Sequence, residues 1–205
     1  MTISEKIAEY VKRQPYGGVF THKQLVKRFG GHGPLISQSL KKLKEAELIA
    51  PLERGLWQRP KPTRFGPAFA TPEKIVSVLA KERRAFVVPS GAKALNEFGA
   101  STQMPMKPVF ISTKRIQPIK LGKAQIEFKY SQAFEHAVKH LSGLSKDEKE
   151  TAARLWVALE YAGKEHAERE GNVFKKVYLS LSEKGQKKLI SALEGKLKWA
   201  QPILE

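Results

Sequence analysis

Residues 35–59 read LISQSLKKLKEAELIAPLERGLWQR, and this stretch decides the fold of the N-terminal part of the chain. Ile36, Leu40 and Leu43 follow the spacing i, i+4, i+7, which places them on one side of an amphipathic helix. Two short apolar runs, on either side of a turn that contains glycine, follow this helix at 48–50 and 56–59. The stretch therefore predicts a basic helix followed by a β-hairpin.

Two further helices are predicted before the basic helix. Apolar spacing over Ile3–Lys12 predicts the first, which PYGG at 15–18 ends because proline and glycine disfavour helix continuation. Thr21 is placed to cap the second helix, and GGHG at 30–33 separates it from the basic helix. Three helices followed by a β-hairpin is the order of a winged helix-turn-helix domain, which we predict for residues 1–64.

Residues 65–205 are predicted to form a second domain. RPKPTRFGP at 59–67 is rich in proline and basic residues, which is typical of a linker or an extended arm. In the core, residues 72–130, the pattern predicts helices at 71–84 and 90–98 and strands at 86–88, 109–112, 116–121 and 125–130. Residues 131–205 are predicted to be helical. The predicted fold class is α+β, a winged helix-turn-helix domain followed by a mixed α/β domain with a helical C-terminal part.

The helical part carries its own start signals. Ser145-Lys-Asp-Glu148 has the sequence of a capping box. The helix that it opens has an apolar face made of Ala152, Leu155, Trp156, Leu159 and Ala162. Residues 173–181 are compatible with a helix or a strand, and Ser182 is placed to cap a last helix.

Net charge is the strongest functional signal. The chain has 37 Lys and Arg against 20 Asp and Glu, a formal charge of +17, of which residues 1–64 carry +8. Such a field attracts nucleic acids and anionic membranes. The sequence predicts no membrane span and no signal peptide. The absence of cysteine excludes disulfides and thiol chemistry, and it fits a cytoplasmic protein.

The basic helix presents polar side chains beside its apolar stripe. The DNA major groove admits one α-helix, whose N-terminal half reaches base edges. We therefore predict base contacts from Ser37, Gln38 and Lys41, and phosphate contacts from Lys42 and Lys44. The second helix, the hairpin tip and the following segment complete the predicted contacts with Thr21, Lys23, Arg54, Arg59, Lys61 and Arg64. A solvated basic face is the alternative interpretation. A single such domain covers a short site, so we expect salt-dependent binding as a pair on repeats.

Other candidate sites favour structural roles. His136 and His140 are spaced i, i+4, but no HExxH glutamate or third ligand accompanies them, so they are interpreted as surface residues rather than a metal site. GGHG at 30–33 lacks the Gly-Lys-Ser/Thr ending of a phosphate loop. Ser90 is interpreted as a helix cap rather than part of an anion site. No pattern predicts catalysis or a cofactor.

Two stretches resemble a known family. LISQSLKKLKEAELIAPLERGLWQRPK, residues 35–61, resembles the winged-helix end of the antitoxin subunit of AbiE-type (type IV) toxin–antitoxin abortive-infection systems. RAFVVPSGAKALNEFGASTQMPMKPVFISTKRIQPIKLGKAQIEFKY, residues 84–130, resembles the second-domain core of a branch of these antitoxins. The resemblance covers roughly residues 1–130. Ala46-Glu47 stands where many winged helices have a glycine, so the sequence does not fix the residue at which the basic helix ends.

The resemblance implies a repressor and an antitoxin. The N-terminal domain would bind repeats in the promoter of its own operon through Gln38, Lys41, Lys42 and Arg54. The second domain would counteract a nucleotidyltransferase-like toxin without a stable complex between the two proteins. The basic residues Lys114, Arg115, Lys120 and Lys123 are the hypothesis for this activity. A basic RNA- or ribosome-binding protein and a plain winged-helix regulator remain as alternatives.

Overall fold

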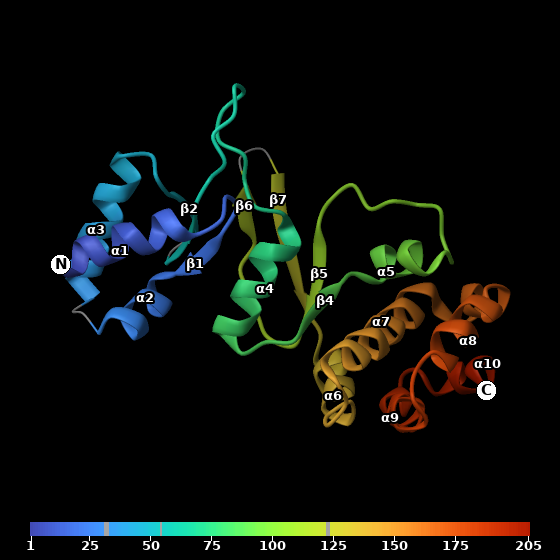
Figure 1. Ribbon diagram of the computed structural model, residues 1–205. Coiled ribbons are helices and arrows are strands. Elements are labelled where there is room, and N and C mark those ends of the chain that lie inside the picture. The colour runs from blue at the N-terminus through green and yellow to red at the C-terminus, as the bar shows by residue number, and fades with distance from the viewer. Residues whose placement is uncertain (31–32, 54, 122–123) are drawn as a thin grey trace. The chain divides into compact units, whose positions relative to one another are not determined.

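The computed structural model describes residues 1–30, 33–53, 55–121 and 124–205 as an α+β fold with two small sheets, which confirms the predicted class. Contacts divide the chain into two compact units (Figure 1). The first unit consists of Met1–Arg84 and Ile119–Gln125, and the second unit of Ala85–Pro118 and Ile126–Glu205. No helix in these described ranges has the length and the apolar character that a membrane span requires.

The first unit combines helices with very short strands. In chain order, its elements are α1 (Ile3–Arg13), β1 (Val19–Thr21), α2 (His22–Phe29), α3 (Gly33–Glu45), β2 (Ala50–Glu53), β3 (Leu56–Gln58), α4 (Pro72–Arg83) and β6 (Ile119–Leu121). The three predicted helices before the hairpin are confirmed. The strand predicted at 48–50 is wrong in position, because β2 begins at Ala50. β1 was not predicted, since three residues are too few to show an alternating pattern.

Side-chain caps fix the starts of α1 and α2. The Thr2 hydroxyl accepts the backbone N–H of Glu5, whose carboxylate accepts the N–H of Thr2 at 2.9 Å. Thr21 and Gln24 form the same reciprocal pair before α2, at 3.0 and 3.1 Å. Each pair satisfies N–H groups that a helix start leaves without partners. The predicted cap at Thr21 is therefore confirmed, and α2 begins directly after β1.

The core of the first unit fixes which side of α3 faces outward. The predicted stripe of Ile36, Leu40 and Leu43 is buried. It packs in one cluster with Ile7, Val11, Phe20, Leu25 and Ile49. Burial of apolar surface contributes about 25 cal/mol per Å² to stability, so this side of the helix is held inward.

A three-stranded antiparallel sheet closes the first unit. β3 is its central strand, and Trp57 of β3 lies opposite Phe20 of β1 and Pro51 of β2. The pairing of β2 with β3 shifts in register between Pro51 and Glu53. β6 contacts β2 within the same unit.

Residues 61–68 form a short arm, so the predicted alternative of an extended arm describes this segment better than a linker (Figure 1). The backbone N–H groups of Lys61 and Ala68 each donate to the other residue's carbonyl, at 3.3 and 2.9 Å. At the tip, the Thr63 hydroxyl donates to the Gly66 carbonyl at 2.6 Å. These bonds close the segment on itself and make it part of the first unit.

Helix α4 belongs to the first unit, beyond the boundary predicted at residue 64. The backbone N–H of Ala70 donates to the side-chain oxygen of the buried Gln58 at 2.8 Å. α4 then contacts β1 and buries Ile75, Val76 and Leu79. The unit ends at Arg84 because these contacts join segments that are far apart in the sequence.

The second unit is mostly helical. Its elements are β4 (Val87–Pro89), α5 (Gly91–Phe98), β5 (Val109–Ser112), β7 (Ala124–Tyr130), α6 (Gln132–His140), α7 (Lys146–Arg169), α8 (Gly171–Leu179), α9 (Glu183–Leu193), the 3-10 turn η1 (Lys198–Ala200) and α10 (Gln201–Leu204). The first two residues of β7 belong to the first unit. β4 is antiparallel to β5, and β5 is parallel to β7. The segment left open at 173–181 is largely helical, and α10 follows the helix that was predicted to be the last.

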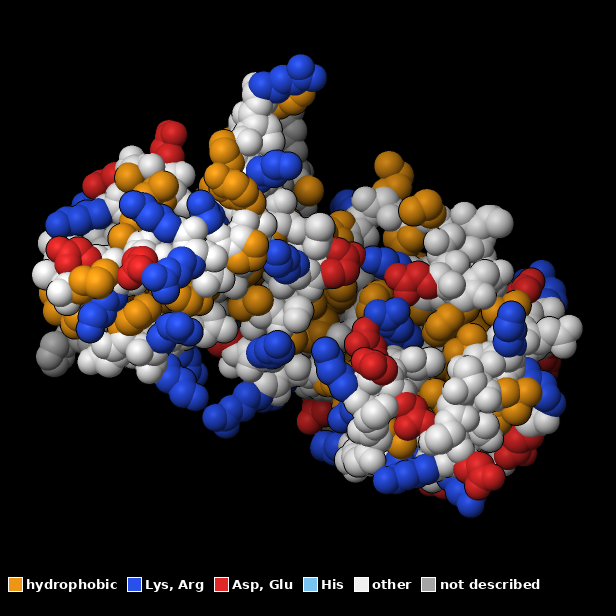
Figure 2. Space-filling view, in the orientation of Figure 1, with side chains coloured by type: hydrophobic (Ala, Val, Ile, Leu, Met, Phe, Trp, Pro, Cys, Tyr) orange, Lys and Arg blue, Asp and Glu red, His pale blue; other side chains and the backbone are white. Residues whose placement is uncertain are grey.

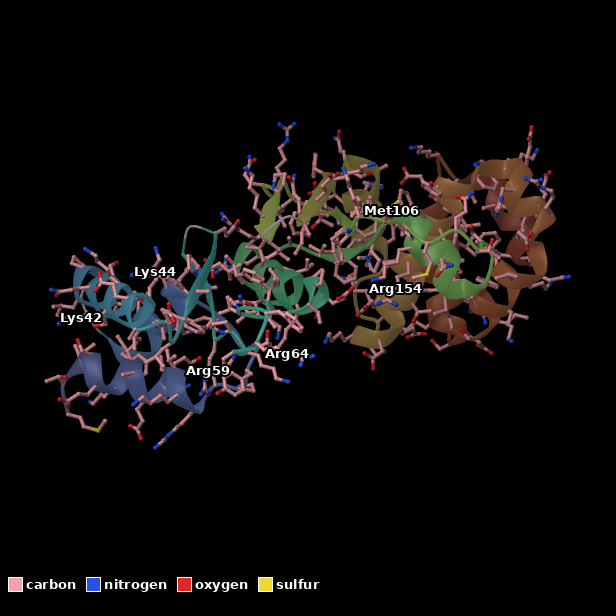
Figure 3. All side chains as sticks on the ribbon, turned by 90° about the horizontal axis from the view of Figure 1, so that it is seen from above. Lys42, Lys44, Arg59, Arg64, Met106 and Arg154 are labelled. Atoms are coloured by element: carbon pink, nitrogen blue, oxygen red, sulfur yellow. The ribbon has the colours of Figure 1, made fainter. Side chains whose placement is uncertain are left out.

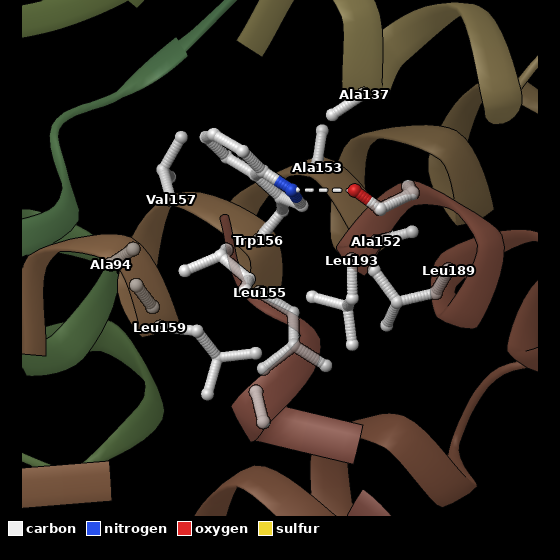
Figure 4. Packing of buried hydrophobic residues seen from close by; sticks show 14 of the residues in the cluster. Ala94, Ala137, Ala152, Ala153, Leu155, Trp156, Val157, Leu159, Leu189 and Leu193 are labelled. Carbon is white, nitrogen blue, oxygen red and sulfur yellow. Dashed lines mark hydrogen bonds between the residues drawn. The ribbon is translucent and has the colours of Figure 1, made fainter. Parts of the chain in front are cut away.

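Trp156 of α7 lies in the core of the second unit. Its indole N–H donates to the backbone carbonyl of Ala192 at 3.0 Å (Figure 4). Of the predicted apolar face of α7, Ala152, Leu155, Trp156 and Leu159 are buried and Ala162 is half-buried. The same cluster includes Val88 of β4 and Ala94 of α5. The part of the predicted core that lies in the second unit and the helical C-terminal part therefore share one hydrophobic interior.

The predicted capping box at Ser145 forms only in part. The Ser145 hydroxyl accepts the backbone N–H of Glu148 at 3.2 Å. The Glu148 carboxylate accepts the backbone N–H of Ser182 at 2.8 Å and its hydroxyl at 2.5 Å. Ser182 caps α9, as predicted, so Glu148 connects the starts of two helices.

Candidate nucleic-acid interface

The outward side of α3 is polar and basic. Ser37, Gln38, Lys41, Lys42 and Lys44 are all exposed, between the residues of the buried stripe. Lys42 and Lys44 project from the helix (Figure 3). No ion pair is formed by the three lysines within the part of the chain that the structure describes. The structure thus brings these five predicted residues together on one exposed helix surface.

Positive charge is concentrated in the first unit. Its residues, 1–84 and 119–125, include 19 Lys and Arg against 7 Asp and Glu, a formal charge of +12. The second unit has 18 against 13, a charge of +5, although it is the longer of the two. Basic side chains are spread over the visible face of the first unit, and one extends from the tip of the arm (Figure 2). The division made by the structure therefore separates the charge more sharply than the boundary at residue 64.

The start of α2 is fixed against α3 by a histidine that the sequence analysis did not single out. His22 Nε2 lies 3.1 Å from the Ser37 hydroxyl and 3.3 Å from the Gly33 carbonyl. Lys23 is exposed beside it. Thr21 is only 1% exposed, and its hydroxyl accepts the backbone N–H of Gln24, so the structure shows Thr21 as a helix cap and its phosphate contact stays a prediction. The signal for its true role was the cap position itself.

A hollow of about 540 Å³ lies between these helices, the β2–β3 hairpin and α4. Its lining residues are His22, Lys23, Ser37, Leu40, Gly55, Trp57 and Glu82. Two of the predicted contact residues, Lys23 and Ser37, therefore lie at one concave part of the surface. The indole N–H of Trp57 and Oε2 of Glu82 are buried and have no hydrogen-bond partner among the described residues.

Arg59 has a structural role in place of the predicted phosphate contact. Its guanidinium donates to the carbonyls of Lys12 and Gln14, the last of which follows the end of α1. It also lies 4.5 Å from the centre of the Tyr16 ring. Carbonyls at a helix C-terminus attract a cation, because the helix dipole is negative there. The guanidinium is therefore occupied inside the first unit.

The arm carries the next two predicted residues, Lys61 and Arg64. Both are exposed, and the Arg64 guanidinium lies 4.7 Å from the centre of the Phe65 ring. Phe65 is 87% exposed and was not among the predicted contacts. A cation stacked on an exposed aromatic ring is a chemistry that suits phosphates, sugars and base edges.

The remaining predicted residues do not form one cluster. Arg54 and Lys123 lie outside the described residues. Lys120 belongs to the first unit, whereas Lys114 and Arg115 belong to the second, where Arg115 lies 5.7 Å from the centre of the Tyr130 ring. The hypothesis of one basic antitoxicity surface therefore covers residues of two separate units.

The residues considered for a metal or an anion are His136, His140 and Ser90, which belong to the second unit, and GGHG at 30–33. His136 is exposed and His140 half-exposed, with ring centres 5.0 Å apart. Within the described ranges, no three His, Asp or Glu side chains are grouped as metal ligands. Ser90 precedes α5 in the cap position, but its hydroxyl makes no cap hydrogen bond. GGHG at 30–33 falls partly outside the described residues.

Comparisons with known proteins place the chain in a family. Among solved structures, the crystal structure of the RV2827C protein from Mycobacterium tuberculosis is similar, with 15% identity and a TM-score of 0.43 over 100% of this chain and 81% of that one. No curated protein matches. A model of the "Family of unknown function (DUF6088)" matches residues 6–151, most of the chain. The chain therefore belongs to the DUF6088 family.

Proposed function

We propose that the first unit is a winged helix-turn-helix domain that binds double-stranded DNA, with α3 in the major groove and the β2–β3 hairpin as the wing. The observation that carries the proposal is the outward side of α3, where Ser37, Gln38 and Lys41 are exposed near the N-terminal half. α2 precedes α3 and is fixed to it by the His22–Ser37 hydrogen bond. This order and this exposure are what a recognition helix requires.

Each exposed residue has a distinct role in this proposal. Gln38 pairs with adenine and Lys41 with guanine, because their side chains match the major-groove edges of these bases. Lys42, Lys44 and Lys23 bind phosphates, which fix position and carry no sequence information. Lys61 and Arg64 on the arm bind phosphates or the minor groove. The charge of +12 on this unit supports the electrostatic part of the affinity.

Double-stranded RNA is less well matched to this surface. The major groove of A-form RNA is deep and narrow, so side chains on a helix do not reach its base edges. The affinity of the chain is compared at about 150 mM salt for three nucleic acids: the DNA upstream of its own gene, a scrambled duplex and an RNA hairpin. This comparison distinguishes DNA binding from RNA binding. We expect the upstream duplex to bind most tightly. Equal affinity for all three would reject sequence-specific binding, and a preference for the hairpin would favour the RNA-binding alternative.

Variants of α3 test the assigned roles. Gln38→Ala and Lys41→Ala should each weaken binding to the upstream duplex by about 1–3 kcal/mol, the value of one good bidentate base contact. They should leave binding to the scrambled duplex nearly unchanged. Lys187→Ala, an exposed lysine on α9 of the second unit, is the matched control for loss of one charge. If Gln38→Ala, Lys41→Ala and Lys187→Ala change the affinity for the upstream duplex equally, the proposed docking of α3 in the major groove is wrong.

The resemblance of residues 84–130 extends the proposal to the second unit. In this extension, the chain represses its own operon and counteracts a nucleotidyltransferase-like toxin. Co-expression with a nucleotidyltransferase-like toxin, with growth as the readout, tests the antitoxin role. A chain with Gln38→Ala and Lys41→Ala should still rescue growth if antitoxicity does not depend on DNA binding. Absence of rescue by the unchanged chain would leave a regulator without antitoxin activity.

A further inference from the structure

The predicted contacts ended at Arg64, but the first unit continues through α4. The last turn of this helix carries Lys81, and Arg84 follows it as the C-terminal cap. Both side chains are exposed. The position of α4 within the first unit is set by its contacts with β1 (Figure 1). The end of α4 is therefore a fixed part of the unit that we propose binds DNA.

A groove of about 250 Å³ lies between α2 and the end of α4. Its lining residues are Thr21, Lys23, Gln24, Lys27, Lys81, Glu82 and Arg84. Lys23 and Lys27 are spaced i, i+4, so they lie on the same side of α2. Lys81 and Arg84 face them from α4. Four cations and one carboxylate thus line a single small groove.

The four cations of this groove are available to a ligand. None of them forms an ion pair, a hydrogen bond through its side chain or a stacking contact with the residues that the structure describes. Like charges that lie close together repel, which costs folding free energy. Arg84 also holds a left-handed backbone conformation, with φ of 50°. A bound polyanion would neutralise this local excess of charge.

The groove adjoins the proposed recognition surface. Lys23 and Glu82 line both this groove and the hollow of about 540 Å³ that contains Ser37. The end of α4 is also connected to β2, since the Arg83 guanidinium lies 3.5 Å from the Glu53 carboxylate. Burial raises the pKa of Glu53, and Arg83 acts in the opposite direction. Groups bound at α3 and in the groove would therefore keep a constant separation.

We infer that the groove between α2 and α4 binds backbone phosphates of the DNA duplex, next to the segment that α3 reads. Lys23, Lys27, Lys81 and Arg84 donate to phosphate oxygens, as Lys and Arg do in charge-assisted hydrogen bonds. Glu82 lies at the border with the neighbouring hollow and repels phosphate there. This inference rests on the proposed function and extends the interface to a helix beyond the hairpin and the arm.

The salt dependence of binding by the full-length chain tests the inference. The logarithm of the binding constant falls as the logarithm of the salt concentration rises, and each phosphate contact contributes about −0.9 to the slope. Loss of two contacts therefore makes this negative slope shallower by about 1.8. We therefore expect this change for Lys81→Gln combined with Arg84→Gln. The ratio of affinities for the upstream and scrambled duplexes should stay the same, because phosphate contacts carry no sequence information. Glu82→Gln should strengthen binding to both duplexes.

Matched controls separate the possible outcomes. Lys187→Gln combined with Lys198→Gln removes two exposed lysines of the second unit that form no ion pair with the residues that the structure describes, and it should leave the slope unchanged. Equal slopes for the two double variants would overturn the inference while the proposed function stands. Absence of duplex binding by the unchanged chain would reject the proposed function itself. A loss of discrimination between duplexes would show that the groove reads bases, which contradicts the phosphate role.

Thermal melting of each variant checks that it is folded, and Glu82→Gln provides a test that requires no loss of binding.

Discussion

Glu47 adopts a backbone conformation that glycine adopts more easily. Its φ is 56°, and it lies two residues after Glu45, the last residue of α3. The N–H of Glu47 donates to the Lys44 carbonyl at 2.9 Å, and the N–H of Leu48 to the Leu43 carbonyl at 3.0 Å. These two bonds form a Schellman ending, in which the left-handed position is usually glycine. Glu47 therefore stands where many winged helices have a glycine, and the turn is kept although the residue differs.

Replacement of Glu47 by glycine is expected to increase the stability of the fold. The left-handed conformation costs a residue with a side chain about 1–2 kcal/mol, and the freedom of glycine in the unfolded chain offsets about 0.5–1 kcal/mol of that. Glu47→Gly should thus raise the free energy of unfolding by about 0.5–1 kcal/mol. Lys42→Gly, inside the same helix, should lower it by about 1 kcal/mol. Urea unfolding measures both, and a loss of stability in both variants would contradict the strain at Glu47.

Glu148 predicts a pH dependence of stability. The hydrogen bonds from Ser182 hold the pKa of Glu148 below its ordinary value of 4.5. Because the folded-state pKa is depressed, the ionised form stabilises the fold above about pH 4.5, and this contribution is lost as the pH falls through the folded-state pKa. Glu148→Gln should lower the melting temperature near neutral pH, and the difference should shrink below about pH 4.5. A difference that is constant across this range would show that Glu148 acts without its charge.

At the scale of elements, the contact between α5 and α7 depends on Gly91. A Cβ atom added there would lie 2.2 Å from Tyr161 Cβ and 2.5 Å from the Val157 carbonyl oxygen. Such distances require the two helices to move apart. We expect Gly91→Ala to lower the free energy of unfolding by about 1–3 kcal/mol through overpacking.

Gly171→Ala is the matched control for this packing prediction. A Cβ at Gly171 would meet its nearest neighbour, Ile203 Cγ2, at 3.4 Å, an ordinary van der Waals distance. This change should be neutral or slightly stabilising, because alanine restricts the unfolded chain. Thermal unfolding compares the two, and equal effects would mean that α5 and α7 adjust freely.

The sequence predicts well those helices whose caps and apolar stripes depend on residues close together in the chain. The caps at Thr21 and Ser182 and the stripe of α3 each depend on neighbours within a few residues. The strand predicted at 116–121 is shorter in the structure, where β6 begins only at Ile119, after Pro118, which has no N–H for a strand ladder. β1 is short, and the pairing that stabilises it comes from β3. Pairing between distant segments leaves little trace in a local pattern, so the sequence could not reveal it.

At the scale of the whole molecule, the sequence located the candidate interface only in part. The outward residues of α3 follow from helical spacing alone. The structural role of Arg59 depends on the carbonyls of Lys12 and Gln14, and the groove between α2 and α4 depends on Lys81 and Arg84. Both are contacts across long stretches of chain. The composition predicted that the chain binds a negatively charged partner. Only the division into units shows that a formal charge of +12 belongs to the first unit.

The first unit extends beyond the hairpin and the arm to Arg84, at the end of α4. A fragment of residues 1–84 should unfold at a higher temperature than a fragment of residues 1–64, although both lack β6. The shorter fragment loses the burial of Ile75, Val76 and Leu79, which are at most 5% exposed. Full burial of one such side chain contributes about 1.5–3 kcal/mol. The shorter fragment also leaves the side-chain oxygen of Gln58 without its donor, the backbone N–H of Ala70. A buried acceptor without a donor costs about 1–3 kcal/mol.

A substitution in the full-length chain provides the same test without truncation. Leu79→Ala should lower the free energy of unfolding by about 2–5 kcal/mol, as expected for a buried leucine. If the first unit instead ended at residue 64, the two fragments would melt together and Leu79→Ala would not affect the unfolding of α1–α3. Hydrogen exchange at the buried amides of α3 distinguishes these results, because protection there reports the stability of the first unit. Faster exchange in the Leu79→Ala chain would identify α4 as part of the structure that holds α3 in place.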